Sequence, residues 1–137
     1  MDDRKGLLLV MMEPPNHMEE EFNDWYDTEH MPERVALPGF GPALRYVCLE
    51  GWPRYMAKYD LASLNVLNEA PYMSMSGEHY SPWTQRVTRH VRGRSRMAAV
   101  QIFGKMQSNP KRPAPRLLFL RFVGIDAARQ SAWVAAM

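Results

Sequence analysis

A histidine flanked by acidic and aromatic side chains has the greatest chemical potential in this sequence. His30 follows Asp27 by three residues and Tyr26 by four, within residues 21–33, EFNDWYDTEHMPE. Histidine changes charge near neutral pH and serves as a general acid or base, so His30 is the candidate catalytic residue. Asp27, one helical turn earlier, is expected to orient its ring. The structural alternative is that His30 caps a helix end or packs against Tyr26 and Pro32.

Five other side chains are candidates for contacting a small organic molecule. Aromatic residues line apolar pockets, and a tyrosine adds a hydroxyl that needs a partner when it is buried. The predicted substrate-binding residues are Tyr26, Tyr46, Arg45, Trp83 and Tyr72. Arg45 or Arg86 could hold a ligand carboxylate. Aromatic rings at helical spacing also build ordinary cores, and we expect that role for Phe22 and Trp25.

A first helix is expected to position His30. Four apolar residues share the i, i+4, i+7, i+8 spacing of one helical stripe, and acidic residues fill the other side. The stripe consists of Met18, Phe22, Trp25 and Tyr26. Pro32 disfavours helical geometry at the residue before it, so this helix should end or kink near His30.

The elements around this helix follow the order strand, helix, strand, strand, helix, strand. The predicted strands cover residues 5–12, 43–50, 54–61 and 94–103. A short helix over 64–70 is expected to be broken by Pro71, and Ser81-Pro82 begins a helix that runs through His90. This order predicts an α+β fold of the ferredoxin-like βαββαβ type. One face of its sheet would carry the helices, and the other would need a partner subunit or a second repeat.

The chain is expected to divide into three parts. Residues 1–103 form the ferredoxin-like domain, and residues 104–115, rich in proline, lysine and serine, form a linker. Residues 116–137 are an extra strand-helix unit, with a strand over 116–123 and a helix capped by Asp126. This unit is interpreted as a truncated or degenerate second repeat, with completion of a dimer as the alternative.

Composition limits the classes of partner and location. The chain has 137 residues, 46% of them hydrophobic, and a net charge of +2, which argues against a nucleic-acid partner. The arginines between residues 86 and 96 are interpreted as a solvated, salt-bridged face. The apolar run 7–12 is far too short to span a membrane, so no membrane partner is expected. The single cysteine, Cys48, cannot form an internal disulfide, so we expect a cytoplasmic protein with Cys48 buried in a strand.

No metal or cofactor is predicted. The four histidines, His17, His30, His79 and His90, show no paired ligand spacing, and no glycine-rich phosphate loop occurs. Coordination of haem iron by His79 or His90 is left open as an alternative.

The assembled pattern resembles the EthD-like family of the dimeric α/β-barrel proteins. The resemblance rests on residues 21–33, Pro38-Gly39-Phe40, Arg45-Tyr46 and Ser81-Pro82-Trp83-Thr84. It covers approximately residues 5–103. It implies a ferredoxin-like fold whose sheets pack face to face in a homodimer, with a small-molecule pocket between sheet and helices.

The function expected from this resemblance is that of a small-molecule pocket protein. Families of related fold include cofactor-free monooxygenases, lactone isomerases, polyketide cyclases and haem-using enzymes, so fold alone does not fix the reaction. We predict a cofactor-independent enzyme of isomerase, cyclase or oxygenase type, acting on a small organic compound in a catabolic or secondary-metabolic pathway. The alternative is a non-catalytic dimeric module that binds a ligand or a protein.

Overall fold

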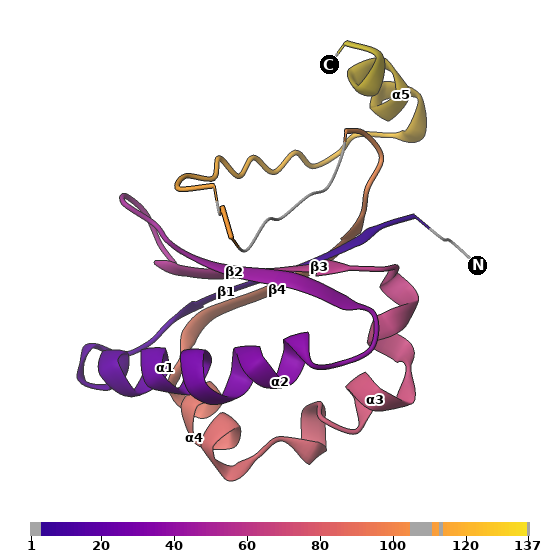
Figure 1. Cartoon of the computed structure of the whole chain (residues 1–137). Helices are drawn as coiled ribbons and strands as arrows, with labels where there is room; N and C mark the ends of the chain where they lie inside the picture. Colours follow the sequence, from indigo (N-terminus) through magenta and orange to yellow (C-terminus); the bar gives the residue numbers. More distant parts are fainter. Residues whose placement is uncertain (1–3, 105–110, 113, 137) are drawn as a thin grey trace.

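A computed structural model of the chain describes residues 4–104, 111–112 and 114–136. Its four strands form one antiparallel sheet in the order β2-β3-β1-β4 (Figure 1). The strands are β1 (Gly6–Glu13), β2 (Phe40–Val47), β3 (Tyr55–Leu61) and β4 (Arg92–Val100). β1 lies in the middle and pairs with both β3 and β4, whereas β2 pairs with β3 at the other side. This is the ferredoxin-like arrangement, so the predicted fold class is confirmed.

The helices before residue 104 all lie on one face of the sheet (Figure 1). The larger ones are α1 (Glu19–Trp25), η2 (Tyr26–His30), α2 (Met31–Val35), α3 (Ala70–Met73) and α4 (Pro82–His90). Shorter turns are η1 (Asn16–Met18), η3 (Leu64–Asn68) and η4 (Gly77–His79). Ser81 caps α4 by accepting a hydrogen bond from the Thr84 amide, as the sequence predicts. Pro71 does not break a helix as predicted; it stands in the first turn of α3, where its missing N–H costs nothing.

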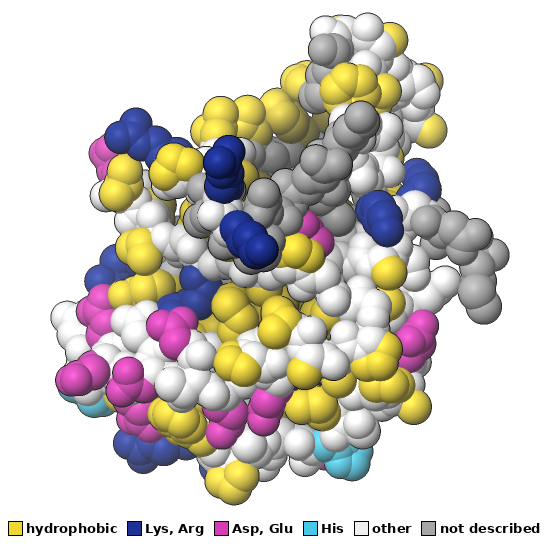
Figure 2. Space-filling model, in the orientation of Figure 1, with side chains coloured by type: hydrophobic (Ala, Val, Ile, Leu, Met, Phe, Trp, Pro, Cys, Tyr) yellow, Lys and Arg dark blue, Asp and Glu magenta, His cyan; other side chains and the backbone are white. Residues whose placement is uncertain are grey.

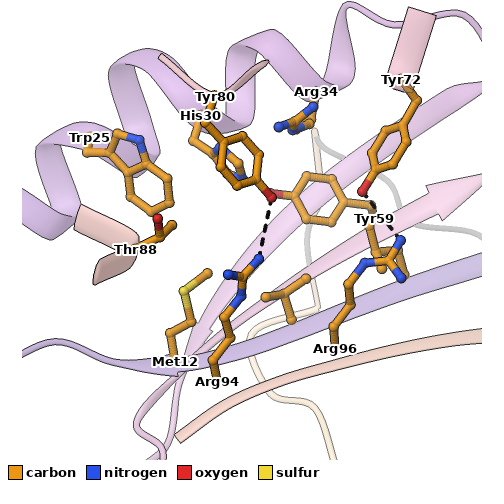
Figure 3. A pocket seen from close by; sticks show the side chains of 12 residues that line it. Met12, Trp25, His30, Arg34, Tyr59, Tyr72, Tyr80, Thr88, Arg94 and Arg96 are labelled. Carbon is orange, nitrogen blue, oxygen red and sulfur yellow. Dashed lines mark hydrogen bonds between the residues drawn. The ribbon is translucent and has the colours of Figure 1, made fainter. Parts of the chain in front are cut away.

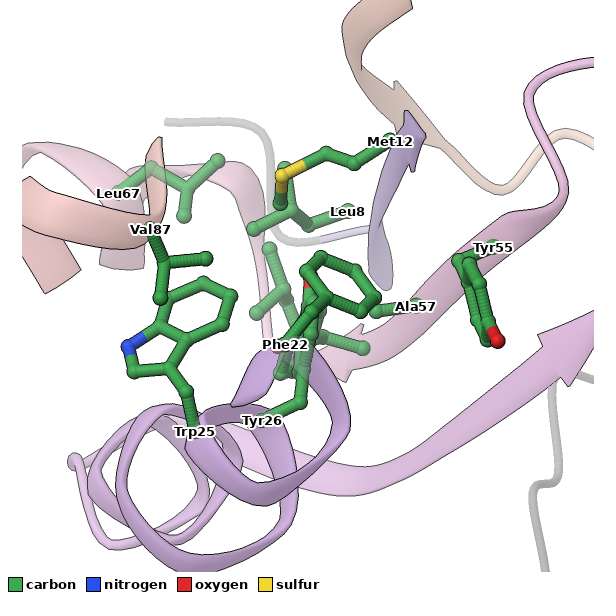
Figure 4. Packing of buried hydrophobic residues seen from close by; sticks show 11 residues of the cluster. Leu8, Met12, Phe22, Trp25, Tyr26, Tyr55, Ala57, Leu67 and Val87 are labelled. Carbon is green, nitrogen blue, oxygen red and sulfur yellow. The ribbon is translucent and has the colours of Figure 1, made fainter. Parts of the chain in front are cut away.

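The core lies between these helices and the sheet. Phe22 and Trp25 are fully buried and Tyr26 is 2% exposed, so the core role expected for Phe22 and Trp25 is confirmed. They pack against Leu8 and Val87, and further core residues come from β1 and β3 (Figure 4). The apolar stripe of the first helix therefore faces the sheet, as its periodicity predicts.

The first helix does not end at His30. It continues through η2, a π-helical turn in which the amide of Met31 donates to the carbonyl of Tyr26, and then through α2 to Val35. Proline cannot donate the hydrogen bond that an α-helix would require of residue 32. A wider turn just before Pro32 accommodates this loss, so the proline changes the geometry of the helix without terminating it.

The register of the sheet determines which side chains reach the helices. Leu8 pairs with Tyr59, and side chains of directly paired residues lie on the same face. Arg45 pairs with Ala57 on this helix-covered face, whereas its neighbour Tyr46 points to the opposite face.

The C-terminal segment lies on the side of the sheet opposite α1–α4 (Figure 1). The strand predicted over 116–123 is not formed; this segment has no strand partner among the described residues. The predicted helix is present as α5 (Ala127–Ala136), with Asp126 accepting a hydrogen bond of 2.8 Å from the amide of Arg129. Apolar side chains of the segment remain exposed, for example Leu118 at 80%, and Figure 2 shows hydrophobic side chains on this part of the surface.

Two further predictions concern residues outside the core. Cys48 is exposed and not buried, because β2 ends at Val47 and Cys48 begins the loop to β3. Most of the predicted linker 104–115 lies outside the described residues. No helix among the described residues is both long enough and apolar enough to cross a membrane.

Candidate functional site

A small cavity lies between the helix layer and the sheet, directly beneath the π-helical turn (Figure 3). Its volume is about 40 Å³, enough for a few water molecules or a small planar group. It is lined by Leu8, Val10, Met12, Trp25, His30, Arg34, Tyr59, Tyr72, Tyr80, Thr88, Arg94 and Arg96. Aromatic and basic side chains thus provide most of its wall.

His30 reaches this cavity from the end of η2. Its ring stacks on Trp25 with 4.5 Å between centroids, and its other side meets the edge of Tyr26 at 5.4 Å. The Nδ1 atom is buried and has no hydrogen-bond partner within the described part of the chain. Burial lowers the pKa of His30 to about 3, and the charges of Arg34 and Arg94 act in the same direction. The imidazole is therefore neutral at physiological pH.

Arg34 follows His30 by one helical turn and is only 4% exposed. Its Nη2 donates a hydrogen bond of 2.6 Å to the carbonyl of Met75, whereas Nη1 is buried without a partner. The guanidinium lies over the rings of Tyr72 and Tyr80, at 5.3 and 5.9 Å from their centroids. Sequence reasoning missed Arg34, although its i+4 spacing from His30 on the same helix was a usable signal.

Tyr59 provides a third polar group at the cavity. Its side chain is 1% exposed, and its hydroxyl makes no hydrogen bond of ordinary geometry among the described residues, although it lies close enough to the Tyr26 hydroxyl for the two groups to influence each other's pKa. Burial raises the pKa of Tyr59 well above its ordinary value, so the hydroxyl keeps its proton. It enters from β3, opposite the helix that carries His30 and Arg34, and was not singled out from the sequence.

The rest of the cavity wall consists of arginines of β4 and of tyrosines in the segment 72–80. Arg94 donates to the hydroxyl of Tyr80 at 3.4 Å, and Arg96 donates to the hydroxyl of Tyr72 at 3.3 Å (Figure 3). These are long hydrogen bonds, and both arginines are otherwise exposed. The two tyrosines close one side of the cavity, and the hydrogen bonds that hold their hydroxyls there are therefore weak.

A hydrogen-bond network holds the ring on which His30 stacks. The indole N–H of Trp25 donates to Oγ1 of Thr84 at 2.9 Å, and Oγ1 of Thr84 donates to Oε1 of Glu29 at 3.1 Å. The hydroxyl of Ser81 also donates to Glu29. The first helix and α4 are tied together in this way, which fixes Trp25 behind His30.

The other predicted site residues lie elsewhere. Asp27 does not orient His30: its side chain is 63% exposed, and Oδ1 accepts a hydrogen bond of 2.6 Å from Arg45. Arg45 in turn lies over the ring of Tyr26, at 4.5 Å from the centroid. Tyr46 points to the opposite face of the sheet. Trp83 donates to Glu21 at 3.2 Å at the edge of the core.

Of the predicted residues, the structure therefore brings only His30 and Tyr72 to the cavity. Tyr26 touches His30 but is itself buried in the core, and burial raises its pKa to about 12. Trp25 was expected to be a core residue; it belongs to the core and also lines the cavity. No cluster of metal-binding side chains occurs within the described ranges.

Comparisons with known proteins extend the fold assignment. No family model and no curated protein matches this sequence. A solved putative antibiotic biosynthesis monooxygenase from Bacteroides thetaiotaomicron is 15% identical, with a TM-score of 0.57 over 77% of this chain and 97% of that chain. The haem degrader MhuD from Mycobacterium tuberculosis is 16% identical, with a TM-score of 0.50 over 74% and 99%.

An EthD family protein from Bacillus halodurans is 11% identical, with a TM-score of 0.48 over 72% of this chain and 99% of that chain. At these identities the likeness shows a shared fold and not a shared activity. The matches cover nearly the whole length of each of these three proteins, and about a quarter of this chain lies outside each match.

Proposed function

We propose that this chain, which has the ferredoxin-like fold of the dimeric α/β-barrel proteins, binds a small organic molecule at the His30 cavity and acts on it without a cofactor. One observation carries the proposal. Among the described residues, three buried polar atoms make no hydrogen bond of ordinary geometry, and the residues that carry them, His30, Arg34 and Tyr59, all line one cavity. Buried polar groups are nearly always paired, and each unpaired one costs about 1–3 kcal/mol. A bound ligand would satisfy all three at once.

The arrangement suits acid/base chemistry. His30 can accept a proton from an acidic C–H or O–H of the substrate, and the electron pair then remains on the substrate as an enolate or phenolate. Arg34 and Tyr59 have hydrogens to donate to that oxygen. The growing negative charge favours the imidazolium, which offsets the low pKa of His30 in the empty protein. Isomerase and cyclase reactions need only such steps; an oxygenase would also consume O₂.

Access to the site requires movement of its aromatic wall. A cavity of about 40 Å³ cannot enclose an organic substrate while Tyr72 and Tyr80 keep their positions. Their hydroxyls are attached only by the long hydrogen bonds to Arg96 and Arg94. Displacement of these two rings toward solvent would open the cavity.

We also propose that the protein is a homodimer. Leu7, on the face of the sheet away from the helices, lines an apolar hollow together with Phe122 and Trp133 of the C-terminal segment, and further apolar residues of that segment, such as Val123 at 76%, remain exposed. Apolar side chains gathered in this way favour association with a second copy. Light scattering would then give a mass of twice 15.9 kDa.

A haem-binding role is not supported by this chain's own residues. The similar protein MhuD is described with two haems in its active site. Here His79 and His90 are exposed and do not line the cavity, and Nδ1 of His90 is engaged with the carbonyl of Arg86. The cavity at His30 is far smaller than a porphyrin, so the proposed reaction does not involve haem.

The test is the response of the His30 ring to small molecules. Ring resonances of the four histidines can be followed by NMR, with His30→Phe identifying that of His30. A panel of small phenols, ketones, lactones and carboxylates should contain compounds that move the His30 signal while those of exposed His17 and His79 stay in place. Turnover of such a compound should disappear in His30→Phe. If no compound in the panel moves the NMR signal of His30, the result would favour a non-catalytic module.

A further inference from the structure

The arginines on the helix-covered side of this protein fall into two groups. In the first group each guanidinium holds a carboxylate: Arg45 with Asp27 at 2.6 Å, Arg54 with Glu13 at 2.7 Å and Arg86 with Glu21 at 2.7 Å. The second group has no carboxylate of the described residues within 4.0 Å, and it consists of Arg34, Arg89, Arg92, Arg94 and Arg96. Three of the second group, Arg34, Arg94 and Arg96, line the His30 cavity, whereas Arg89 and Arg92 are exposed outside it and none of the first group lines it.

We propose that the ligand of this cavity is an aromatic carboxylate, whose carboxylate group is bound by Arg34 with Arg94 and Arg96 nearby. The assignment rests on the proposed function of the site and adds the class of compound that it takes. A buried guanidinium without a counter-charge is costly, and native proteins pair such groups. Arginine is also the side chain best suited to a planar carboxylate.

Arg34 is the main determinant. It lines the cavity, is 4% exposed, donates from Nη2 to the carbonyl of Met75, and has a buried Nη1 with no partner among the described residues. Tyr59 lines the same cavity, and its hydroxyl, which has only a poorly aligned neighbour in Tyr26 among the described residues, is a second donor. A single carboxylate placed between these two groups would accept from both and neutralise the guanidinium.

Size and lining distinguish the carboxylate from other anions. A volume of about 40 Å³ accommodates a planar group of three heavy atoms better than a tetrahedral phosphate. The walls beside Arg34 are the rings of Tyr72 and Tyr80 (Figure 3). An aromatic body attached to the carboxylate would replace these rings, or stack on them, as it displaces them outward.

The experiment compares benzoate with benzamide, which has the same shape and no charge, and includes formate and phosphate. Binding is measured by the His30 ring signal and by the melting temperature, at constant ionic strength. We expect benzoate and formate to bind, with benzamide at least about tenfold weaker than benzoate, a difference of about 1.4 kcal/mol. Equal binding of benzoate and benzamide overturns the proposal, and so does tighter binding of phosphate than of formate.

Substitutions of single arginines test where the carboxylate binds. Arg34→Met should abolish benzoate binding, and Arg86→Met is the matched control that should leave it unchanged, because Arg86 is exposed and already paired with Glu21. Arg94→Met and Arg96→Met alter exposed side chains, so their folding is not in question, and each should weaken benzoate several-fold. Undiminished benzoate affinity in Arg34→Met, or in both Arg94→Met and Arg96→Met, overturns the proposal.

The two proposals fail in different ways. If neutral phenols or lactones move the His30 signal and benzoate does not, the pocket stands and the carboxylate assignment is wrong. If no compound of any charge moves the His30 signal, the proposed function itself is wrong, and the carboxylate assignment falls with it.

Discussion

The imidazole of His30 stacks on the indole of Trp25, with 4.5 Å between the ring centroids, although five residues separate them on one helix. In a regular α-helix two residues five apart point roughly 140° away from each other. The wide turn of η2 removes this mismatch and places His30 next to both Trp25 and Tyr26. Such π-helical turns are frequent at functional sites. The turn is thus what brings the histidine to the cavity.

Loss of the Thr84 hydroxyl should weaken the support behind this stack. Thr84→Val removes the acceptor of the Trp25 indole N–H and a donor to Glu29 in a site that is 1% exposed. We expect the free energy of unfolding to fall by about 1–3 kcal/mol, as measured by urea denaturation. Thr28→Val is the matched control: this exposed hydroxyl bonds only to the carbonyl of Asp24, and the change should stay within about 0.5 kcal/mol. Equal losses in both variants would contradict the network.

Stability should depend on pH through His30. Its pKa is lowered from 6.5 to about 3, so the unfolded chain binds a proton in this interval that the folded protein does not. The contribution is complete above about pH 6.5 and is lost as pH falls toward 3, with a slope of at most ~1.4 kcal/mol per pH unit. Glu19 and Glu21, whose pKa values are lowered from 4.5 by hydrogen bonds to Tyr55 and Arg86 in turn, add the same trend at lower pH.

The measurement is urea denaturation between about pH 7 and about pH 5, above the carboxylates whose pKa values are lowered. Burial raises the pKa of Glu33, which opposes the trend equally in all the variants compared. The wild type should lose stability over this window. His30→Phe, which keeps a ring against Trp25, should lose much less, whereas the exposed control His79→Phe should follow the wild type. Parallel curves for wild type and His30→Phe would show that His30 does not carry the effect.

The sequence predicts the framework of this protein better than its site. Strand periodicity and turn residues led to the correct order of elements, because these signals are local. His30 was identified for a similar reason, because a histidine two residues before a proline within a helical pattern is a local signal. The strand predicted over 116–123 failed because an apolar run becomes a strand only when another strand pairs with it, and no local signal reports that partner.

Individual site residues depend on geometry that sequence patterns leave open. Tyr46 was expected at the pocket beside Arg45, but adjacent strand residues face opposite sides, so at most one of them could reach it. The spacing of Asp27 would let it reach His30 in a regular helix. In this structure its carboxylate forms an ion pair with Arg45 instead. Arg34 and Tyr59 come together with His30 only through the sheet-to-helix packing.

Asp27 is therefore predicted to be dispensable at the cavity. Asp27→Ala removes an exposed pair with Arg45, so the free energy of unfolding should fall by less than about 1 kcal/mol. The NMR signal of His30 and any turnover should be unchanged, because the carboxylate makes no hydrogen bond to that ring. A large loss of turnover with an unchanged fold would instead restore the orienting role expected from the sequence.

Two arginine variants should differ in their effect on the stability of the empty protein. Arg34→Met removes a buried guanidinium that lacks a counter-charge and also the donor to the Met75 carbonyl, so these effects offset each other and the free energy of unfolding should change by less than about 1 kcal/mol. Arg54→Met removes the guanidinium that donates to Oε1 of the buried Glu13 carboxylate, while the backbone N–H of residue 54 still donates to Oε2. Here we expect a loss of about 1–3 kcal/mol. Urea denaturation without added carboxylate gives both values. A loss in Arg34→Met as large as that in Arg54→Met would mean that Arg34 stabilises the fold as it stands, and that its free Nη1 is not reserved for a ligand.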